Sequence, residues 1–447
     1  MDVLNIIDIW DFILVPLYLG LIMLVGYFIK NKYISRYPEF KYLTWGLAVK
    51  CLGSMAFGLV YVFYYGGGDT TNYYKGAVAL ANLASHDFQG FWDIFFNNEL
   101  SWKNFCLFNI NIGYPPWYMW KDHVAFSVCR YSSVFAIIGF KSFWVMGMLT
   151  ACFSYIGLWK LYRLFNMLYP GYSKGFGWTI LFMPSLVFWG SGIMKDTFVL
   201  GAVCWVTMNF FQVFIRRKNL IINLFLLVMN VAIIISMKPY VLLSLIPGML
   251  LWLHSAYMKQ ITHPMLKTIA LPILVLVIGF AGYITFSNLS STMGVYGDVD
   301  SAVKQAKIIQ QDLLREEQYG GNNYYLGEID GSLGNMLGIA PMAIFTALYR
   351  PMLWEIGSPT MVISVIENTI LLLITLVLII RVNPIKYVKI ILSEPILLYS
   401  LVFTLLLAFG VGVASTNFGA LVRYKIPLMP FFFSMIYVVY VKSKERK

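Results

Sequence analysis

The chain has 447 residues, of which 59% are hydrophobic and only 12% are charged. Soluble globular domains carry about twice this charged fraction, so the composition excludes an ordinary soluble domain and indicates a polytopic membrane protein. Aromatic residues make up 17% of the chain, which suits belts of Trp and Tyr at the two membrane interfaces.

Apolar stretches long enough to cross a hydrocarbon core of about 30 Å recur along the whole chain. We therefore predict an all-α, polytopic transmembrane helical bundle, with residues 1–447 forming a single integral-membrane domain. About eleven spans are expected, at residues 10–29, 43–64, 142–160, 177–193, 196–215, 219–237, 240–257, 268–286, 362–381, 391–413 and 426–441. The span at 177–193 is the weakest, because Pro184 and two glycines interrupt it.

Basic residues gather in one set of alternate loops. Nineteen of the 33 Lys and Arg residues, and two of the 21 acidic residues, lie in residues 30–41, 160–175, 216–219, 258–267, 381–389 and 442–447. Because Lys and Arg are enriched in cytoplasmic loops, we expect these loops on the cytoplasmic side of the inner (cytoplasmic) membrane, with the N-terminus outside and the C-terminus inside. This topology accounts for most of the net charge of +12, and no nucleic-acid partner is expected.

The same alternation leaves two large segments at the outer face, residues 65–141 and 287–361. Loops of this length are usually functional or disordered, and the mixed aromatic composition favours ordered surface helices. Before Arg350, an apolar stretch of about ten residues is too short to span and predicts a helix that dips into the membrane surface. Residues 301–331 form either an ordered lid or a flexible linker.

Cysteine and histidine suggest little chemistry. Cys106 and Cys129 share the first outer loop, and a disulfide between them is an alternative to two free thiols. The four histidines show no paired spacing, so a His-based zinc site is not expected. The residues specify no cofactor and leave a divalent metal open.

The stretch GGGDTTNYYKGA, residues Gly66–Ala77, follows the second predicted span directly. Three glycines allow a sharp bend, after which Asp69 or Thr70 could cap a surface helix. A carboxylate close to apolar walls also gains basicity by desolvation, so Asp69 is the candidate general base. Tyr73 and Tyr74 either stack on a sugar ring or anchor the helix at the interface.

Two further clusters lie at the predicted outer face. Lys195 and Asp196 follow a broken span, and a broken helix end with an adjacent lysine suits an anion such as phosphate. The alternative is a tight hairpin with a self-neutralising Lys195–Asp196 pair. Lys238 lies in a short outer turn, where it either binds phosphate or extends its ammonium outward to water.

The last two clusters are also basic and belong to the second half of the chain. Arg350 and Glu355 flank the exit of the predicted dipping helix, either as a functional pair or as an interfacial ion pair. Arg423 and Lys425 stand at the outer end of the last span, where the charge bias would not place them. Arg presents a planar fork that suits bidentate phosphate contact, so these residues are expected to bind a phosphorylated lipid.

The segment Asp69-Thr70-Thr71-Asn72-Tyr73-Tyr74 resembles the first outer loop of the GT-C superfamily of polyprenyl-phosphate-sugar glycosyltransferases. The segments PSLVFWGSGIMKD and RYKIPLMP are similar to parts of those enzymes and of bacterial surface-polysaccharide polymerases. The resemblance implies an inverting sugar transfer at the outer face, with Asp69 as base and the outer Lys and Arg residues on phosphate. The chain departs from the family in having a single Asp, flanked by glycine and threonine, where the first loop often carries an acidic pair. The large C-terminal soluble domain of some members is also absent.

The expected function is therefore a membrane glycosyltransferase that moves sugar from a polyprenyl-phosphate-linked donor to a glycan or other hydroxyl acceptor, in cell-envelope polysaccharide assembly. One alternative is a polymerase that joins lipid-linked repeat units. Another is a transporter of lipid-linked oligosaccharides. A transporter is expected to have polar residues through the bilayer midplane, whereas here only Lys50, Glu367 and Glu394 are candidates. A non-enzymatic membrane scaffold is the third alternative.

Overall fold

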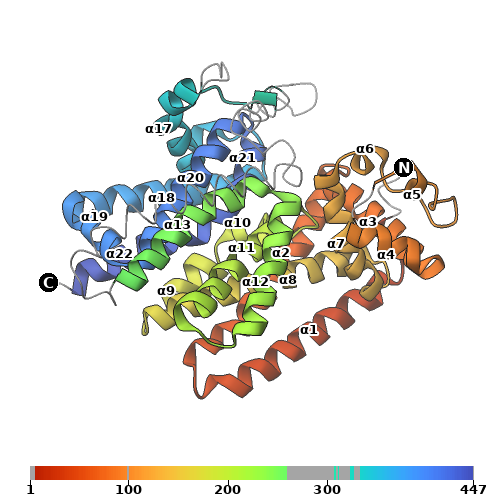
Figure 1. Ribbon diagram of the computed structural model, residues 1–447, viewed down its shortest axis with the longest axis horizontal. Helices are drawn as coiled ribbons and strands as arrows, with labels where there is room; N and C mark the ends of the chain where they lie inside the picture. The colour runs from red at the N-terminus through yellow and green to blue at the C-terminus, as the bar shows by residue number, and fades with distance from the viewer. Residues whose placement is uncertain are drawn as a thin grey trace. The chain divides into compact units, whose positions relative to one another are not determined.

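The computed structural model describes residues 6–97, 100–258, 307–308, 311, 323–326 and 333–445. Within these residues the regular elements are all helices (Figure 1), and one isolated antiparallel bridge joins Asn323 to Asn417. The all-α prediction is confirmed for this part of the chain. The expected span at 268–286 and most of the proposed lid at 301–331 lie outside the described residues.

Nine helices in the described part of the chain are long and apolar enough to cross a membrane. They are α1 (Asp11–Ile34), the continuous helical stretch Pro38–Tyr64 that contains α2 (Lys41–Leu59), α8 (Phe143–Leu168), the stretch Lys195–Arg216 that begins with α11 (Lys195–Phe210), α12 (Leu220–Met237), α13 (Pro239–Met258), α18 (Met361–Val382), α20 (Pro395–Ala414) and the stretch Phe418–Glu445 with α21 (Phe418–Tyr424) and α22 (Met429–Glu445). Long apolar helices of this kind are typical of a membrane protein.

The first helix, α1, shows most directly that the exposed surface of the protein is in contact with lipid. Only 6% of its most apolar window is buried, and Leu17, Leu21 and Phe28 remain exposed. A soluble protein rarely presents such a continuous apolar surface to water. In a bilayer the same surface is in contact with acyl chains, so α1 needs little protein around it.

The stretch at 177–193 is not a single helix, in contrast to the expected span. It begins with a π-helical turn at Gly177–Leu181, which follows the short helix α9 (Ser173–Phe176) directly. Helix α10 (Pro184–Phe188) and a bend come next. Pro184 lacks the backbone N–H that would continue the preceding helix and its ring clashes with the turn before it. Proline is tolerated at the first position of a new helix, and α10 begins there.

Lys50 and close backbone contact attach this broken segment to α2. The Lys50 ammonium donates to the carbonyls of Leu186, at 2.7 Å, and Gly190, at 2.6 Å. A Cβ on Gly53 would lie 2.2 Å from the carbonyl oxygen of Val187, and one on Gly192 would lie 2.1 Å from the Phe57 ring. The segment therefore packs against α2 at a distance that only glycine permits.

The described residues divide into two compact units, which we describe separately. Unit 1 comprises residues Met1–Met208 and Leu226–Lys238, and unit 2 comprises Asn209–Phe225 and Pro239–Lys447. The chain passes between the units three times: inside α11, inside α12, and between Lys238 and Pro239, where α13 begins. No composition shift or linker marks the division. The sequence alone, which predicts one integral-membrane domain, contains no sign of this boundary.

The first long loop, residues 65–141, is part of the packing of unit 1. Its helices are α3 (Asp69–His86), α4 (Phe88–Asn97), α5 (Trp102–Phe105), α6 (Trp117–Trp120) and α7 (His123–Ile138). Helices α3 and α7 lie side by side (Figure 1), and a Cβ on Gly76 would lie 2.5 Å from the Cys129 sulfur. Cys129 is buried at this contact and Cys106 is exposed, and both are free thiols rather than a disulfide.

In unit 2 the apolar stretch before Arg350 belongs to α17 (Leu333–Tyr349), a longer helix than expected. It packs against α20 and contacts α18. A Cβ on Gly412 would lie 2.2 Å from the carbonyl oxygen of Ala343, so α17 and α20 approach each other at glycine distance. This contact fixes the end of α17, where Arg350 lies.

Candidate functional site

The predicted site residues fall into two groups, one in each unit. Unit 1 contains the candidate base and one set of charges: Asp69, Tyr73, Tyr74, Lys195, Asp196 and Lys238. Unit 2 contains the second set: Arg350, Glu355, Arg423 and Lys425.

Asp69 is the first residue of α3, directly after three glycines that bend the chain. Gly66, Gly67 and Gly68 have φ values of 67°, 125° and 134°, a region that L-residues with a side chain rarely adopt. Gly68, rather than Asp69 or Thr70, occupies the position before the helix, and the Thr71 hydroxyl accepts from its N–H at 3.1 Å. Asp69 is exposed, so the desolvation by apolar walls expected from the sequence is not found.

Lys195, the first residue of α11, lies among the carboxylates of unit 1. Its ammonium is 3.8 Å from a carboxylate oxygen of Asp122, and it interacts electrostatically with Asp69 and Asp196. Asp122 caps α7 by accepting from the Val124 N–H at 2.9 Å. The cap holds the Asp122 carboxylate near Lys195, which is half-buried and faces two exposed acids.

Tyr73 lies next to this group and is almost fully buried. Burial, followed by the charges of Asp69, Asp196 and Asp122, raises the pKa of Tyr73 well above its ordinary value. Burial and Asp69 also raise the pKa of Tyr118, in α6. Both phenols are therefore neutral at physiological pH, and Tyr118, which is exposed, can donate a hydrogen bond beside Asp69.

Asp196 and Lys238 form a buried ion pair beneath these groups. Asp196 is 3% exposed and Lys238 is 5% exposed, and the ammonium donates directly to the carboxylate. The self-neutralising Lys195–Asp196 pair is not formed, nor does Lys238 extend outward to water. Adjacent residues on a helix point in different directions, so Asp196 faces inward to Lys238 while Lys195 remains with Asp122.

Tyr74 anchors α3 rather than facing the charged group. Its hydroxyl donates to the carbonyl of Lys141 at 2.9 Å, and its ring packs edge-on against Phe143 with the centroids 5.4 Å apart. The sequence left two roles open for the adjacent tyrosines, stacking on a sugar ring or anchoring the helix. The contacts of Tyr74 support the anchoring role. It ties the start of α3 to the turn between α7 and α8.

In unit 2, Arg350 is held in a fixed position by two rings and an acid. The guanidinium carbon is 5.1 Å from the ring centroid of Tyr324 and 5.1 Å from that of Phe418. Its Nε donates to both carboxylate oxygens of Glu355, at 2.9 and 3.2 Å. Glu355 also accepts from the N–H of Met352 at 2.8 Å, so the turn after α17 holds this ion pair.

Lys425 is buried beneath Arg350. Its ammonium donates to the Arg350 carbonyl at 3.0 Å and to the side-chain oxygen of Asn368 at 2.8 Å, and Glu367 is the nearby opposite charge. At 2% exposure Lys425 acts as a support for the end of α17, rather than as a group open to a ligand. Arg423 is half-buried, and its Nε donates to the Gly419 carbonyl at 3.2 Å.

The structure also identifies residues that sequence reasoning missed. Asp122 and Tyr118 join the group around Asp69 and Lys195, and Tyr324 and Phe418 enclose Arg350. An Asp just before a helical pattern signals a cap, but nothing local indicates that this cap approaches Lys195. The partners of Arg350 come from segments far apart in the chain, and no sequence spacing marks them.

The group in unit 1 combines the exposed carboxylate of Asp69 with the ammonium of Lys195. In unit 2, Arg350 is paired with Glu355, and Arg423 is half-buried. Among the described residues, no three His, Cys, Asp or Glu side chains are arranged to hold a metal ion.

Comparison with known proteins assigns no family to this arrangement. No family model matches the chain, and neither a curated protein nor a solved structure is similar to it.

Proposed function

We propose that the chain is an integral-membrane glycosyltransferase of the GT-C type, which transfers sugar from a polyprenyl-phosphate-linked donor to a hydroxyl acceptor. The observation that carries the proposal is the group in unit 1, where the Lys195 ammonium lies 3.8 Å from the Asp122 carboxylate. Asp69, at the start of α3, also acts electrostatically on Lys195, at the start of α11. An acid that accepts a proton and a cation that stabilises a departing phosphate are the two requirements of this reaction.

In the proposed reaction Asp69 accepts the proton of the acceptor hydroxyl, whose oxygen attacks the anomeric carbon of the sugar. The bond from that carbon to the phosphate oxygen breaks, and the phosphate leaves with the bonding electrons. Attack from the face opposite the phosphate inverts the anomeric centre. Asp69 is exposed in the free protein, and a bound acceptor would cover it and remove competing water.

Lys195 and the exposed phenol of Tyr118 are the partners for the developing phosphate charge and for sugar hydroxyls near Asp69. The buried pair of Asp196 and Lys238 supports the start of α11 from below. Lys238 and Asp196 are thus assigned a positioning role, because neither is exposed enough to touch a ligand.

Arg350 and Arg423 are the phosphate-binding candidates of unit 2, supported by Lys425. The two rings beside Arg350 limit its rotamers, so less side-chain entropy is lost when an anion binds. Glu355 balances the charge of Arg350 in the free protein and would compete with a bound phosphate.

The proposal includes the topology, with both groups at the outer face of the cytoplasmic membrane. The charge bias of the loops supports this orientation. A polymerase that joins lipid-linked repeat units would need the same base and the same cations. It would differ from the proposed transferase only in its acceptor.

The positions of the interior charges weigh against a transporter. Lys50 is bonded to two carbonyls of the α10 segment, Glu394 is paired with Lys442, and Glu367 lies near Lys425. A transport path needs charges that can exchange partners with a substrate, whereas these three hold helices together.

The proposal is tested with Asp69→Asn in the full-length protein, reconstituted in nanodiscs with a panel of polyprenyl-phosphate sugars. Removing a general base lowers the transfer rate by about 10²–10⁴-fold, while the folded protein and its lipid binding persist. The matched control is Asp93→Asn, on α4, where the carboxylate accepts from Gln89 at 3.2 Å. Normal product from Asp69→Asn would overturn the role of Asp69.

Native mass spectrometry of the protein extracted from its own membrane tests the donor separately. A bound polyprenyl phosphate that is lost in Lys195→Ala or in Arg423→Ala assigns the phosphate to unit 1 or to unit 2. A protein that carries no such lipid, and retains function without these cations, would be better explained as a scaffold.

A further inference from the structure

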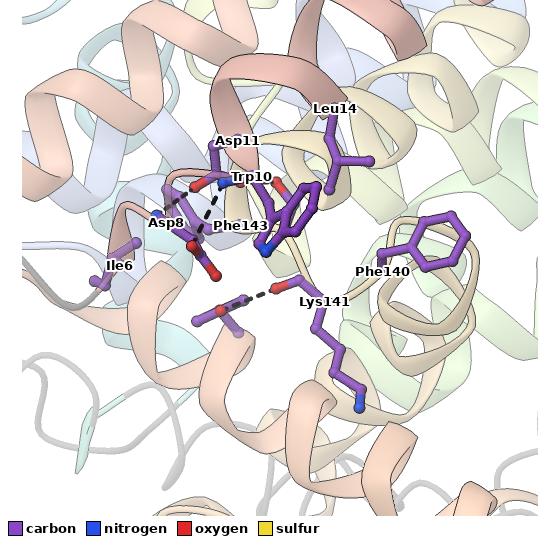
Figure 2. Close-up of a pocket in the computed structure, with 10 residues that line it drawn as sticks. Ile6, Asp8, Trp10, Asp11, Leu14, Phe140, Lys141 and Phe143 are labelled. Carbon is purple, nitrogen blue, oxygen red and sulfur yellow. Dashed lines mark hydrogen bonds between the residues drawn. The ribbon is translucent and has the colours of Figure 1, made fainter.

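Unit 1 contains a concave site that is separate from the group around Asp69. A cavity of about 470 Å³ lies where the chain enters α1, beside the turn between α7 and α8 (Figure 2). Pockets that bind small molecules have volumes of about 300–1,000 Å³ and combine apolar walls with a few polar groups. This cavity has that size and that composition, and neither the proposed base nor the phosphate-binding candidates line it.

Two carboxylates form the polar side of the cavity, from Asp8 and Asp11 (Figure 2). Asp11 is buried, and its oxygens accept from the Asp8 N–H at 2.9 Å and from the Ser142 hydroxyl. Asp8 is exposed, and its carboxylate accepts a long bond of 3.4 Å from the N–H of Trp10. Among the described residues, no Lys or Arg forms an ion pair with Asp8.

Aromatic rings form the other side. Trp10 is 62% exposed and Phe140 is 72% exposed, and both residues line the cavity. Phe140 and Lys141 have positive φ values of 50° and 63°, which are uncommon for residues with a side chain. The Tyr74 hydroxyl holds this turn through the Lys141 carbonyl.

The one basic lining residue, Lys141, does not neutralise the acids. Figure 2 shows its side chain running away from Asp8 and Asp11, with the ammonium at the far end. The cavity thus has two carboxylates and one ammonium directed elsewhere. Burial and the charges of Asp11 and Asp8 also raise the pKa of Tyr74, to about 12, so that the phenol adds no charge.

The ligand of this cavity could be a cation, a neutral sugar or an anion. An anion would be repelled by the two carboxylates, and a neutral ligand would leave the charge of Asp8 unbalanced as it covers the site. An ammonium group satisfies both sides of the cavity, because it pairs with a carboxylate and is attracted to the faces of aromatic rings.

We propose that the Asp8–Trp10–Phe140 cavity binds an organic ammonium group, either the headgroup of a zwitterionic lipid or a soluble amine. The site stands independently of the proposed sugar transfer, since none of its residues is assigned to that reaction. Its place at the start of α1, an apolar helix with little protein around it, suits a headgroup at the membrane boundary.

The charge requirement is tested with choline and with 3,3-dimethyl-1-butanol, its uncharged isostere. Binding to the full-length protein in phosphatidylglycerol nanodiscs is measured by ligand-observed NMR. We expect the isostere to bind at least about tenfold more weakly than choline, because it lacks the cation that the carboxylate and the rings attract. Equal binding of the two, or no binding of choline, would overturn the proposal.

Three variants assign the binding to this cavity. Asp8→Asn is expected to weaken choline binding about tenfold, and Trp10→Leu several-fold. Lys141→Gln removes an opposing charge and is expected to tighten binding about twofold. Asp93→Asn is the matched control and leaves the affinity unchanged. Choline binding that ignores Asp8 and Trp10 would place the ligand elsewhere and refute the assignment.

Native mass spectrometry distinguishes the two sources of the amine. In nanodiscs containing phosphatidylglycerol, phosphatidylethanolamine and phosphatidylcholine, retention of an amine lipid that is lost in Asp8→Asn identifies a lipid headgroup. Choline binding without retained amine lipid identifies a soluble amine. Retention of phosphatidylglycerol alone at this site would contradict the proposal.

Discussion

At the scale of single residues, the buried charges of this protein are partnered over long distances in the sequence. Asp196 pairs with Lys238 and not with the adjacent Lys195, and Lys425 reaches the Arg350 carbonyl. Removing one member of a buried pair strands the other charge, which costs far more than losing a surface pair. The functional candidates Lys238 and Lys425 are therefore also structural residues, and their variants must be interpreted with a stability measurement.

The buried pair gives the first prediction. Lys238→Met leaves Asp196 buried without its cation and is expected to lower the free energy of unfolding by about 3–5 kcal/mol. Thermal unfolding in detergent measures the effect. The double variant Asp196→Leu with Lys238→Met removes both charges and should regain most of that loss. A single variant as stable as the wild type would show that the pair is not formed.

Tyr74 gives a prediction with a defined pH window. At pH 8, Tyr74→Phe loses the hydrogen bond to the Lys141 carbonyl and about 1 kcal/mol of stability. The pKa of the folded phenol is raised from its ordinary value near 10 to about 12. Between these two values the unfolded chain releases the proton and the folded one keeps it, so wild-type stability falls by at most about 1.4 kcal/mol per pH unit.

The advantage of the wild type over Tyr74→Phe should therefore shrink above pH 10 and reverse before pH 12. Chemical unfolding at pH 8, 10 and 11 measures it, with the exposed residue Tyr64 as the control through Tyr64→Phe. A constant difference across this range would mean that Tyr74 titrates normally.

At the scale of elements, the broken segment around α10 decides where the first charged group lies. The sequence predicts a weak span at 177–193, and the structure shows why it is weak. Pro184 ends the preceding helix, and Lys50 bonds to the carbonyls that remain at the end of α10. Because α11 starts directly after this segment, the attachment to α2 sets the position of Lys195.

Gly53 tests that attachment. Gly53→Ala adds a Cβ 2.2 Å from the carbonyl oxygen of Val187, which forces α2 and the α10 segment apart and costs about 1–3 kcal/mol. The control is Gly20→Ala in α1, where nothing lies within 4 Å of the new Cβ. The control should be as stable as the wild type or slightly more stable, since alanine favours helix.

If the attachment also positions Lys195, Gly53→Ala weakens binding of polyprenyl phosphate and Gly20→Ala does not. Native mass spectrometry measures the lipid binding of both variants, on the same preparations that are used for thermal unfolding. Equal thermal stability of the two glycine variants would contradict the close contact at Val187.

At the scale of the whole molecule, membrane character follows from nine long apolar helices in the described residues. Orientation is a separate property, and it rests on the distribution of Lys and Arg between loops. Cys106 offers a direct measurement, because it is exposed and lies in the loop of residues 65–141 that is expected outside. Cys51, Cys129 and Cys204 are buried and should react slowly.

In intact cells, a membrane-impermeant maleimide should label the wild-type protein through Cys106, and Cys106→Ser should abolish most of the labelling. Labelling is measured by the mass of the purified protein. If Cys106 reacts only after the membrane is permeabilised, the predicted orientation is inverted and both candidate sites belong to the cytoplasmic side.

The sequence by itself determined the fold class and the nine long apolar helices of the described residues, because hydrophobicity and length are local properties that a bilayer selects directly. It also placed Asp69 after a glycine bend and marked several of the charges that a membrane chain does not keep without cause. Only the tertiary structure decided which of those charges meet. The pairing of Asp196 with Lys238 and the rings around Arg350 depend on contacts between distant segments, and such contacts leave no pattern in the local sequence.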